Sequence, residues 1–121
     1  MANENVLTLG DDNFENEVLK SNVPVLVDFW APWCAPCRVV SPLVERIGQD
    51  LRGRLKVVKV NTDNAPTLSA RFGIPGIPTL ALLDHGKELA RVTGALDERA
   101  LRSWVDGHLP APQATPSQKA G

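Results

Sequence analysis

Residues 23–30 (VPVLVDFW) form a nearly continuous run of apolar, β-forming side chains, and this run constrains the fold more than any other segment. A strand with one face in solvent alternates apolar and polar residues, whereas a strand covered on both faces does not. The run therefore predicts a central strand of an α/β sheet. Asp28 is the one charged residue within it.

Strand and helix patterns alternate along the rest of the chain. Further β-forming runs occupy residues 6–9, 55–60, 79–83 and 88–92, the last two on either side of a glycine-containing turn. Apolar residues recur at helical spacing over residues 12–19, 34–51, 65–72 and 97–109. This order predicts an α/β fold: a single mixed central sheet of about five strands flanked by about four helices. We expect strands joined through helices to be parallel and the last two strands to form an antiparallel hairpin.

Individual residues predict where the helices begin, bend and end. Asp12 and Glu15 have the spacing of a helix N-cap and its partner three residues later. Asn64 and Pro66 are expected to open the third helix and Gly73 to end it. Pro42 lies inside the second helical pattern and predicts a kink there.

Composition narrows the class of protein. The chain has 121 residues, 43% hydrophobic and 22% charged, as expected for one globular domain. Its 13 basic and 14 acidic side chains argue against binding to nucleic acid or to a membrane surface. The apolar runs are well short of the roughly 20 residues of a membrane helix. The first residues lack the basic flank of a secretory signal, so we expect a cytoplasmic, reducing location, where a permanent structural disulfide is disfavoured.

We expect one folded domain over residues 4–109, present as a monomer. Residues 110–121 contain three prolines, three alanines and no large apolar side chain. Such a segment buries too little surface to offset the entropy lost when it becomes ordered. It is therefore predicted to be a flexible Pro/Ala-rich C-terminal tail.

The two cysteines, Cys34 and Cys37, lie where the central strand gives way to a helix. Two thiols three positions apart in a first helical turn can close into a disulfide with little backbone movement. The partial positive charge of a helix N-terminus favours thiolate over thiol, and the thiolate is the species that attacks disulfides. Pro36 stiffens the loop between the sulfurs and needs no hydrogen-bond acceptor there. The pattern indicates a redox-active pair.

Three other interpretations compete with a redox-active pair. A structural disulfide would close a very small ring and stabilise little. Structural zinc needs about four ligands, and the only further candidates, His85 and His108, are distant in sequence, so we expect no metal site. Two unrelated buried cysteines are the third possibility.

Several further segments match one family in order and spacing. They are residues 25–38 (VLVDFWAPWCAPCR), Pro42, and residues 58–61 (VKVN), 73–79 (GIPGIPT) and 94–95 (GA). With these segments the chain resembles the thioredoxin family from about residue 6 to residue 109. The resemblance implies the thioredoxin fold and a protein disulfide reductase that maintains cellular redox balance. Cys34 would attack a client disulfide, and Cys37 would resolve the mixed disulfide. The start of a helix exposes the first sulfur and partly shields the second, which supports that order.

The resemblance also implies the source of electrons. A thioredoxin holds no bound cofactor, and a flavin-dependent thioredoxin reductase re-reduces it with electrons from NADPH. Ala35 stands where most thioredoxins have glycine, and Pro75 where a basic residue is frequent. Because Cys34 has no cationic partner in the motif, we expect a thiol pKa of about 7 and a potential of about −270 mV, values typical of thioredoxins.

Asp28 and Lys59 are candidates for proton transfer. Asp28 interrupts the apolar strand before Cys34, and burial without a partner raises the pKa of a carboxyl group. The alternative is an edge-facing aspartate in a bent strand. In thioredoxins the matching aspartate helps to deprotonate the resolving cysteine through water, and Lys59 matches a lysine near it. A solvated strand lysine is the alternative for Lys59.

The resemblance further implies a cis peptide bond at Ile77–Pro78, packed against the cysteines and leaving the Ile77 backbone free to pair with an extended client. A mostly apolar rim around the cysteines would bind substrate. Its residues are Trp33, Ala35, Pro36, Gly76, Ile77, Pro78, Gly94 and Ala95. Core packing is the alternative for Trp33, and a plain turn glycine is the alternative for Gly94.

Two functions remain open at this point. The first is thiol–disulfide exchange with client proteins; an isomerase or oxidase is a weaker variant, because oxidising relatives commonly carry histidine where Pro36 stands. The second is a redox-independent binding partner or folding helper that uses the same rim.

Overall fold

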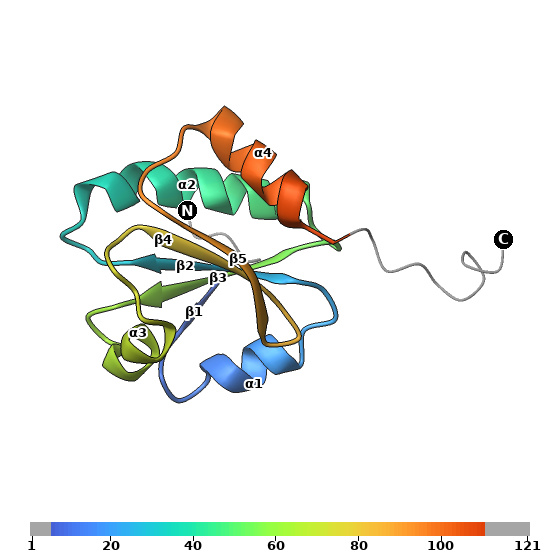
Figure 1. The fold of residues 1–121 in the computed structure, drawn as a ribbon. Coiled ribbons are helices and arrows are strands. Elements are labelled where there is room, and N and C mark those ends of the chain that lie inside the picture. Colours follow the sequence, from blue (N-terminus) through green and yellow to red (C-terminus); the bar gives the residue numbers. More distant parts are fainter. Residues whose placement is uncertain (1–5, 111–121) are drawn as a thin grey trace, which may run out of the picture.

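The computed structural model describes residues 6–110, and Figure 1 shows how they are arranged. The strands are β1 (Val6–Leu9), β2 (Val25–Trp30), β3 (Lys56–Asn61), β4 (Thr79–Asp84) and β5 (Lys87–Thr93). The helices are α1 (Phe14–Leu19), α2 (Ala35–Asp50), α3 (Pro66–Phe72) and α4 (Glu98–His108). The predicted order of strands and helices is confirmed. The predicted tail lies outside the described residues apart from Pro110.

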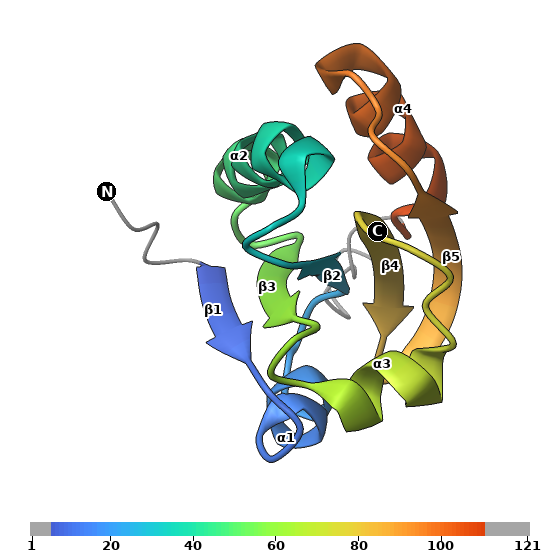
Figure 2. The ribbon, with the colours of Figure 1, turned by 90° about the vertical axis from the view of Figure 1, so that its left-hand side faces the viewer.

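One five-stranded sheet, in the order β1-β3-β2-β4-β5, forms the middle layer. Helices α2 and α4 cover one face and α1 and α3 the other (Figure 2). The side chains of β2 alternate between the two faces, as strand geometry requires. Val25, Val27 and Phe29 join the core beneath α1 and α3, whereas Leu26 joins the core beneath α2 and α4. Asp28 has the same parity as Leu26 and therefore faces α2.

The prediction that all strands joined through helices are parallel is wrong for β4. Strands β1 and β2 both pair with β3 in parallel, but β4 pairs with β2 antiparallel, although α3 lies between β3 and β4. After α3, Ile77 packs against the cysteines that follow the end of β2. The chain thus re-enters the sheet from the end at which β2 finishes, so β4 must run in the opposite direction. The β4–β5 hairpin is antiparallel, as predicted.

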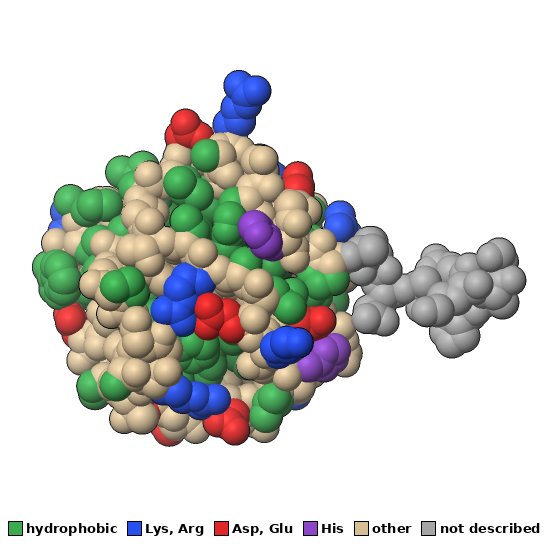
Figure 3. Space-filling model, viewed as in Figure 1, with side chains coloured by type: hydrophobic (Ala, Val, Ile, Leu, Met, Phe, Trp, Pro, Cys, Tyr) green, Lys and Arg blue, Asp and Glu red, His purple; other side chains and the backbone are tan. Residues whose placement is uncertain are grey.

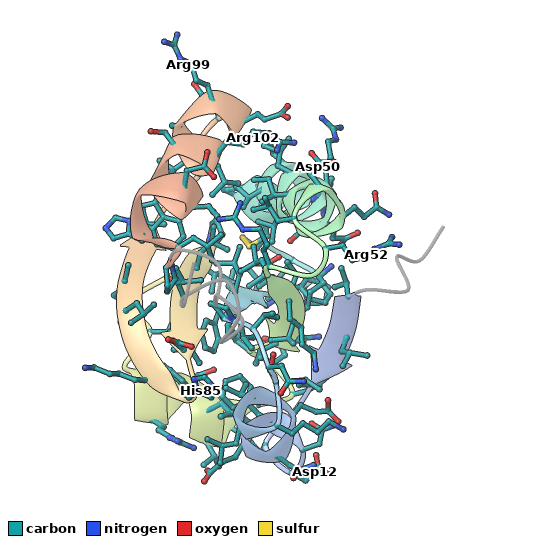
Figure 4. All side chains as sticks on the ribbon, turned by 90° about the vertical axis from the view of Figure 1, so that its right-hand side faces the viewer. Asp12, Asp50, Arg52, His85, Arg99 and Arg102 are labelled. Atoms are coloured by element: carbon teal, nitrogen blue, oxygen red, sulfur yellow. A yellow bond between two sulfur atoms is a disulfide. The ribbon has the colours of Figure 1, made fainter. Side chains whose placement is uncertain are left out.

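Two predicted helix caps are also wrong. Asn13, not Asp12, is the N-cap residue of α1, and its side chain accepts a hydrogen bond from the Gly10 N–H instead of capping the helix. Asp12 is exposed at the surface (Figure 4), and Glu15 pairs with an arginine of α3 instead of completing a cap.

Helix α3 is capped from a distant part of the chain. Its N-cap position is Ala65 rather than Asn64, and its own side chains provide no cap. Instead the Asp11 carboxylate accepts the backbone N–H groups of Thr67 and Leu68. Gly73 ends α3 in the left-handed conformation, as predicted. Helix α2 continues without a break through Pro42.

Ion pairs fasten α4 to α2. The Arg102 guanidinium contacts Asp50 at 2.7 Å and Glu98 at 3.0 Å, and Figure 4 shows Arg102 and Asp50 on the two facing helices. Arg46 of α2 also reaches Glu98. On the face shown in Figure 3, basic and acidic side chains are interspersed with hydrophobic ones. Within residues 6–110, no helix combines the length and apolar content needed to cross a membrane.

Candidate active site

The two cysteines form a disulfide in the first turn of α2, drawn as the yellow bond in Figure 4. β2 delivers the chain to this point, and the Cys34 N–H donates to the Ala31 carbonyl in the turn that follows the strand. Cys34 is the N-cap residue of α2, and its sulfur accepts the Cys37 N–H at 3.3 Å. The Cα atoms are 5.3 Å apart, within the range of ordinary disulfides.

Both cysteines are more deeply covered than the sequence predicted. Cys34 is 4% exposed and Cys37 is 1% exposed. Cys34 is thus the more exposed of the two, as expected, but the difference is small. The cover comes from Ala31 and from the partly buried Trp30 and Ile77, which pack around the two sulfur-bearing residues. Little of the Cys34 surface is therefore open to a client in the oxidised protein.

Asp28 is fully buried in the middle of the sheet. Its strand neighbours are Lys59 on β3 and Leu80 on β4. The Ser41 hydroxyl of α2 donates to the Asp28 Oδ2 atom at 2.6 Å. Burial raises the pKa of Asp28 to about 6, while the Ser41 hydrogen bond and the Lys59 charge oppose the rise and Glu45 adds to it. The alternative of an edge-facing aspartate is excluded.

Lys59 is not a solvated strand lysine. Its ammonium contacts the Glu45 carboxylate at 3.1 Å and lies over the Trp30 ring at 4.7 Å from the centroid, with the side chain 18% exposed. Asp28 and Lys59 are register partners on adjacent strands. Lys59 therefore supplies positive charge beside the buried carboxyl group, and its ammonium forms an ion pair with Glu45 of α2.

The peptide bond between Ile77 and Pro78 is cis. Pro78 is itself buried, and its carbonyl accepts the Gly94 N–H at 2.9 Å. Gly94 has a φ of +109°, which favours glycine, so it is a turn glycine. Its hydrogen bond to Pro78 also links this turn to the cis-proline loop. Ala95 is exposed beside it. Pro78 thus anchors the rim from beneath and offers little surface of its own.

Trp33 is 67% exposed, so core packing is excluded for it. Its indole N–H donates to both carboxylate oxygens of Asp63 at 3.1 Å. Between Trp33 and the cis-proline loop lies a groove of about 300 Å³, lined by Trp33, Thr62, Ser69, Ile74, Gly76 and Ile77. Ala35 and Pro36, which lie between the two cysteines in sequence, are also exposed. The predicted rim is therefore largely brought together around the disulfide.

Sequence reasoning missed three residues of the site: Ser41, Glu45 and Asp63. Ser41 follows Cys37 by one helical turn, so the two share a face of α2. That spacing is the signal by which it could have been found. In the part of the chain that the structure describes, no group of three histidine, cysteine or acidic side chains is arranged to hold a metal ion.

A disulfide at a helix start, with a buried carboxyl group on the strand that leads to it, is the arrangement of a thiol–disulfide exchange protein. Comparison with known proteins identifies the family. The thioredoxin family model matches residues 5–107, and the chain belongs to the thioredoxin family. Cys34 and Cys37 are its redox pair, and its activity is the reduction of protein disulfides.

Individual relatives are similar over most of their length. The chain is 50% identical to thioredoxin 1 of Nostoc sp. over 99 residues, which cover 82% of this chain and 92% of the relative. It is 48% identical to thioredoxin 1 of Synechococcus elongatus over the same shares. It is 44% identical over 101 residues to a chloroplastic M-type thioredoxin of Chlamydomonas reinhardtii, covering 84% of this chain and 72% of the relative. As a thioredoxin, the protein works with a reductase and with client proteins.

Proposed function

We propose that Cys34 is the nucleophile and Cys37 the resolving cysteine. The observation that carries this order is the N-cap position of Cys34, where the partial positive charge of α2 favours its thiolate. The Cys34 thiolate attacks one sulfur of a client disulfide, and the other client sulfur leaves as a thiolate. The Cys37 thiolate then attacks the Cys34 sulfur, the Cys34–client bond breaks, and the client leaves with both sulfurs reduced.

Asp28, assisted by Lys59, is proposed as the group that accepts the proton of Cys37. Its buried carboxyl group has a pKa of about 6, so it is mostly ionised at pH 7 and can accept a proton. Because this pKa is close to the working pH, the group can also release the proton again. The nearby Lys59 charge favours the ionised form. Asp28→Asn is expected to slow exchange while leaving the fold intact, and an unchanged exchange rate would remove Asp28 from the mechanism.

Clients are proposed to bind as extended segments across the rim. The Ile77 backbone would pair with the client by strand addition, and the groove beside Trp33 would take one of its side chains. Gly76, Gly94 and Ala95 leave space for a client backbone near the disulfide. Ala35 and Pro36 would form the far side of the contact.

The remaining assignments also stand as proposals. The protein would act as a monomer in the cytoplasm, with residues 4–109 as its one domain, and without nucleic-acid or membrane partners. A thioredoxin reductase would supply electrons from NADPH. The interspersed charges on the surface in Figure 3 support the expectation that nucleic acid is not a partner.

The test is reduction of insulin disulfides, first with dithiothreitol as the electron source and then with NADPH and a thioredoxin reductase. Turnover in both assays is expected, and the Cys34→Ser, Cys37→Ser double variant should show none. Absence of turnover by the wild-type protein in both assays would contradict the proposal. If the double variant still fulfils the biological role in cells, the role is redox-independent binding instead.

A further inference from the structure

Ser41 is a buried residue whose hydroxyl contacts the buried carboxyl group of the site. Its side chain is 6% exposed and donates to Oδ2 of Asp28 at 2.6 Å, and Asp28 itself is 0% exposed. Among residues 6–110, the second carboxyl oxygen, Oδ1, has no hydrogen-bonding protein partner. The two oxygens of Asp28 are therefore not equivalent.

The same serine lies next to the resolving cysteine. Cys37 and Ser41 are four residues apart on α2, so their side chains occupy one face of the helix on successive turns. Both line a hollow of about 280 Å³, whose walls also include Trp30, Glu45 and Lys59. The hollow thus brings Cys37, Ser41 and the Lys59–Glu45 ion pair around one space, and Ser41 connects it to the buried Asp28 through its hydrogen bond.

We propose that Ser41 is a positioning residue of disulfide exchange: its hydroxyl binds Oδ2 of the Asp28 carboxylate and leaves Oδ1 to accept the proton of Cys37. This inference rests on the proposed role of Asp28. In the step itself, the Cys37 thiol loses a proton and becomes a thiolate, while Asp28 gains that proton and becomes a neutral acid. The thiolate then attacks Cys34, and the departing client thiolate takes up a proton.

The physical basis is stabilisation of a buried anion. A hydrogen bond to a charged group in a low-dielectric site stabilises the charged form more than the neutral form. The other charges that face Asp28 are Lys59 on β3, which favours the anion, and Glu45 on α2, which opposes it; β4 contributes the uncharged Leu80. Without the Ser41 hydroxyl, less of the free-energy cost of burying the Asp28 anion is offset, so the pKa of Asp28 rises.

Ser41→Ala is therefore expected to raise the pKa of Asp28 by about one unit. From a starting value of about 6, the ionised fraction at pH 7 would fall from roughly nine-tenths to about half. Ser41→Thr retains the hydroxyl and should keep the wild-type value. Ser21→Ala removes another buried serine hydroxyl, one that bonds Val23 at the far end of β2, and is the matched control.

Two measurements test the proposal. The first is NMR titration of the Asp28 carboxyl carbon in the oxidised protein, in which neither cysteine titrates. The second is the pH dependence of the resolving step, followed by stopped flow as Cys37 releases a chromogenic thiolate from a mixed disulfide on Cys34. Ser41→Ala should move both midpoints upward by the same amount, and Ser41→Thr and Ser21→Ala should move neither.

The outcomes separate this inference from the role of Asp28. If Ser41→Ala leaves both midpoints in place while Asp28→Asn still slows the resolving step, Ser41 has no positioning role and the Asp28 role stands. If Ser41→Ala moves the carboxyl titration alone and Asp28→Asn resolves at the wild-type rate, both roles are overturned.

Discussion

The buried carboxyl group of Asp28 predicts an unusual dependence of stability on pH. Burial raises the pKa of Asp28 from its ordinary value of 3.8 to about 6 in the folded protein. The folded state therefore binds a proton more tightly than the unfolded chain. Its contribution to stability is greatest when Asp28 is protonated, declines as the pH rises from about 4 to about 6, and is lost above that range.

The magnitude follows from the two values. The difference between them corresponds to about 3 kcal/mol, of which roughly 2–3 kcal/mol is lost between pH 4 and pH 8. Asp28→Asn removes this ionisation. The free energy of unfolding of the variant, relative to wild type, should thus increase by roughly 2–3 kcal/mol between the two pH values. Any packing cost of the amide side chain changes the free energy of unfolding of the variant equally at both pH values. It therefore cancels when the two pH values are compared.

Urea denaturation of the oxidised proteins at pH 4 and pH 8 measures this difference. A change of that size moves the relative midpoint by about 1–2 M urea, since m-values of small domains are about 1–3 kcal/mol/M. Asp12→Asn, which removes an exposed carboxylate, is the control and should show little pH-dependent difference. A relative stability of Asp28→Asn that is the same at both pH values would refute the reasoning.

Three further predictions concern positions outside the cysteine pair. Gly48→Ala places a Cβ atom 2.6 Å from Val57 Cγ2 and should cost about 1–3 kcal/mol in urea denaturation; unchanged stability would contradict the packing of α2 on β3. Asp11→Ala removes the remote cap of α3 and should cost about 1 kcal/mol, with faster amide exchange at the start of that helix. Trp33→Ala should leave the unfolding free energy within about 0.5 kcal/mol of wild type but raise the KM for a protein disulfide, because the indole is 67% exposed; an unchanged KM would remove it from the client surface.

The cysteine pair and Asp28 could be predicted because their signals are local. Residues 23–37 contain the buried strand, the charge that interrupts it and the helix start that holds both thiols. An apolar run without alternation requires cover on both faces, so a carboxyl group within it must be buried. The central strand, the helix start and the unusual carboxyl group thus follow from one segment of the chain.

The remainder depends on contacts between distant segments. The spacing from Cys37 places Ser41 on the cysteine-bearing face of α2, but its contact with Asp28 arises only because the face of β2 that carries Asp28 meets α2. Likewise Asp11 caps α3 across 56 residues, in preference to the local Asn64. The direction of β4 follows from the packing of Ile77 on the cysteines, which no local propensity encodes.

Trapping of the mixed disulfide tests the central claim most directly. The reduced Cys37→Ser variant, mixed with a disulfide-containing client, should accumulate a covalent complex whose mass equals protein plus client, joined through Cys34. The Cys34→Ser variant should accumulate far less, because Cys37 is 1% exposed and is not at the N-cap of α2. A complex that forms equally through either cysteine, or only through Cys37, would contradict the assignment of Cys34 as the nucleophile.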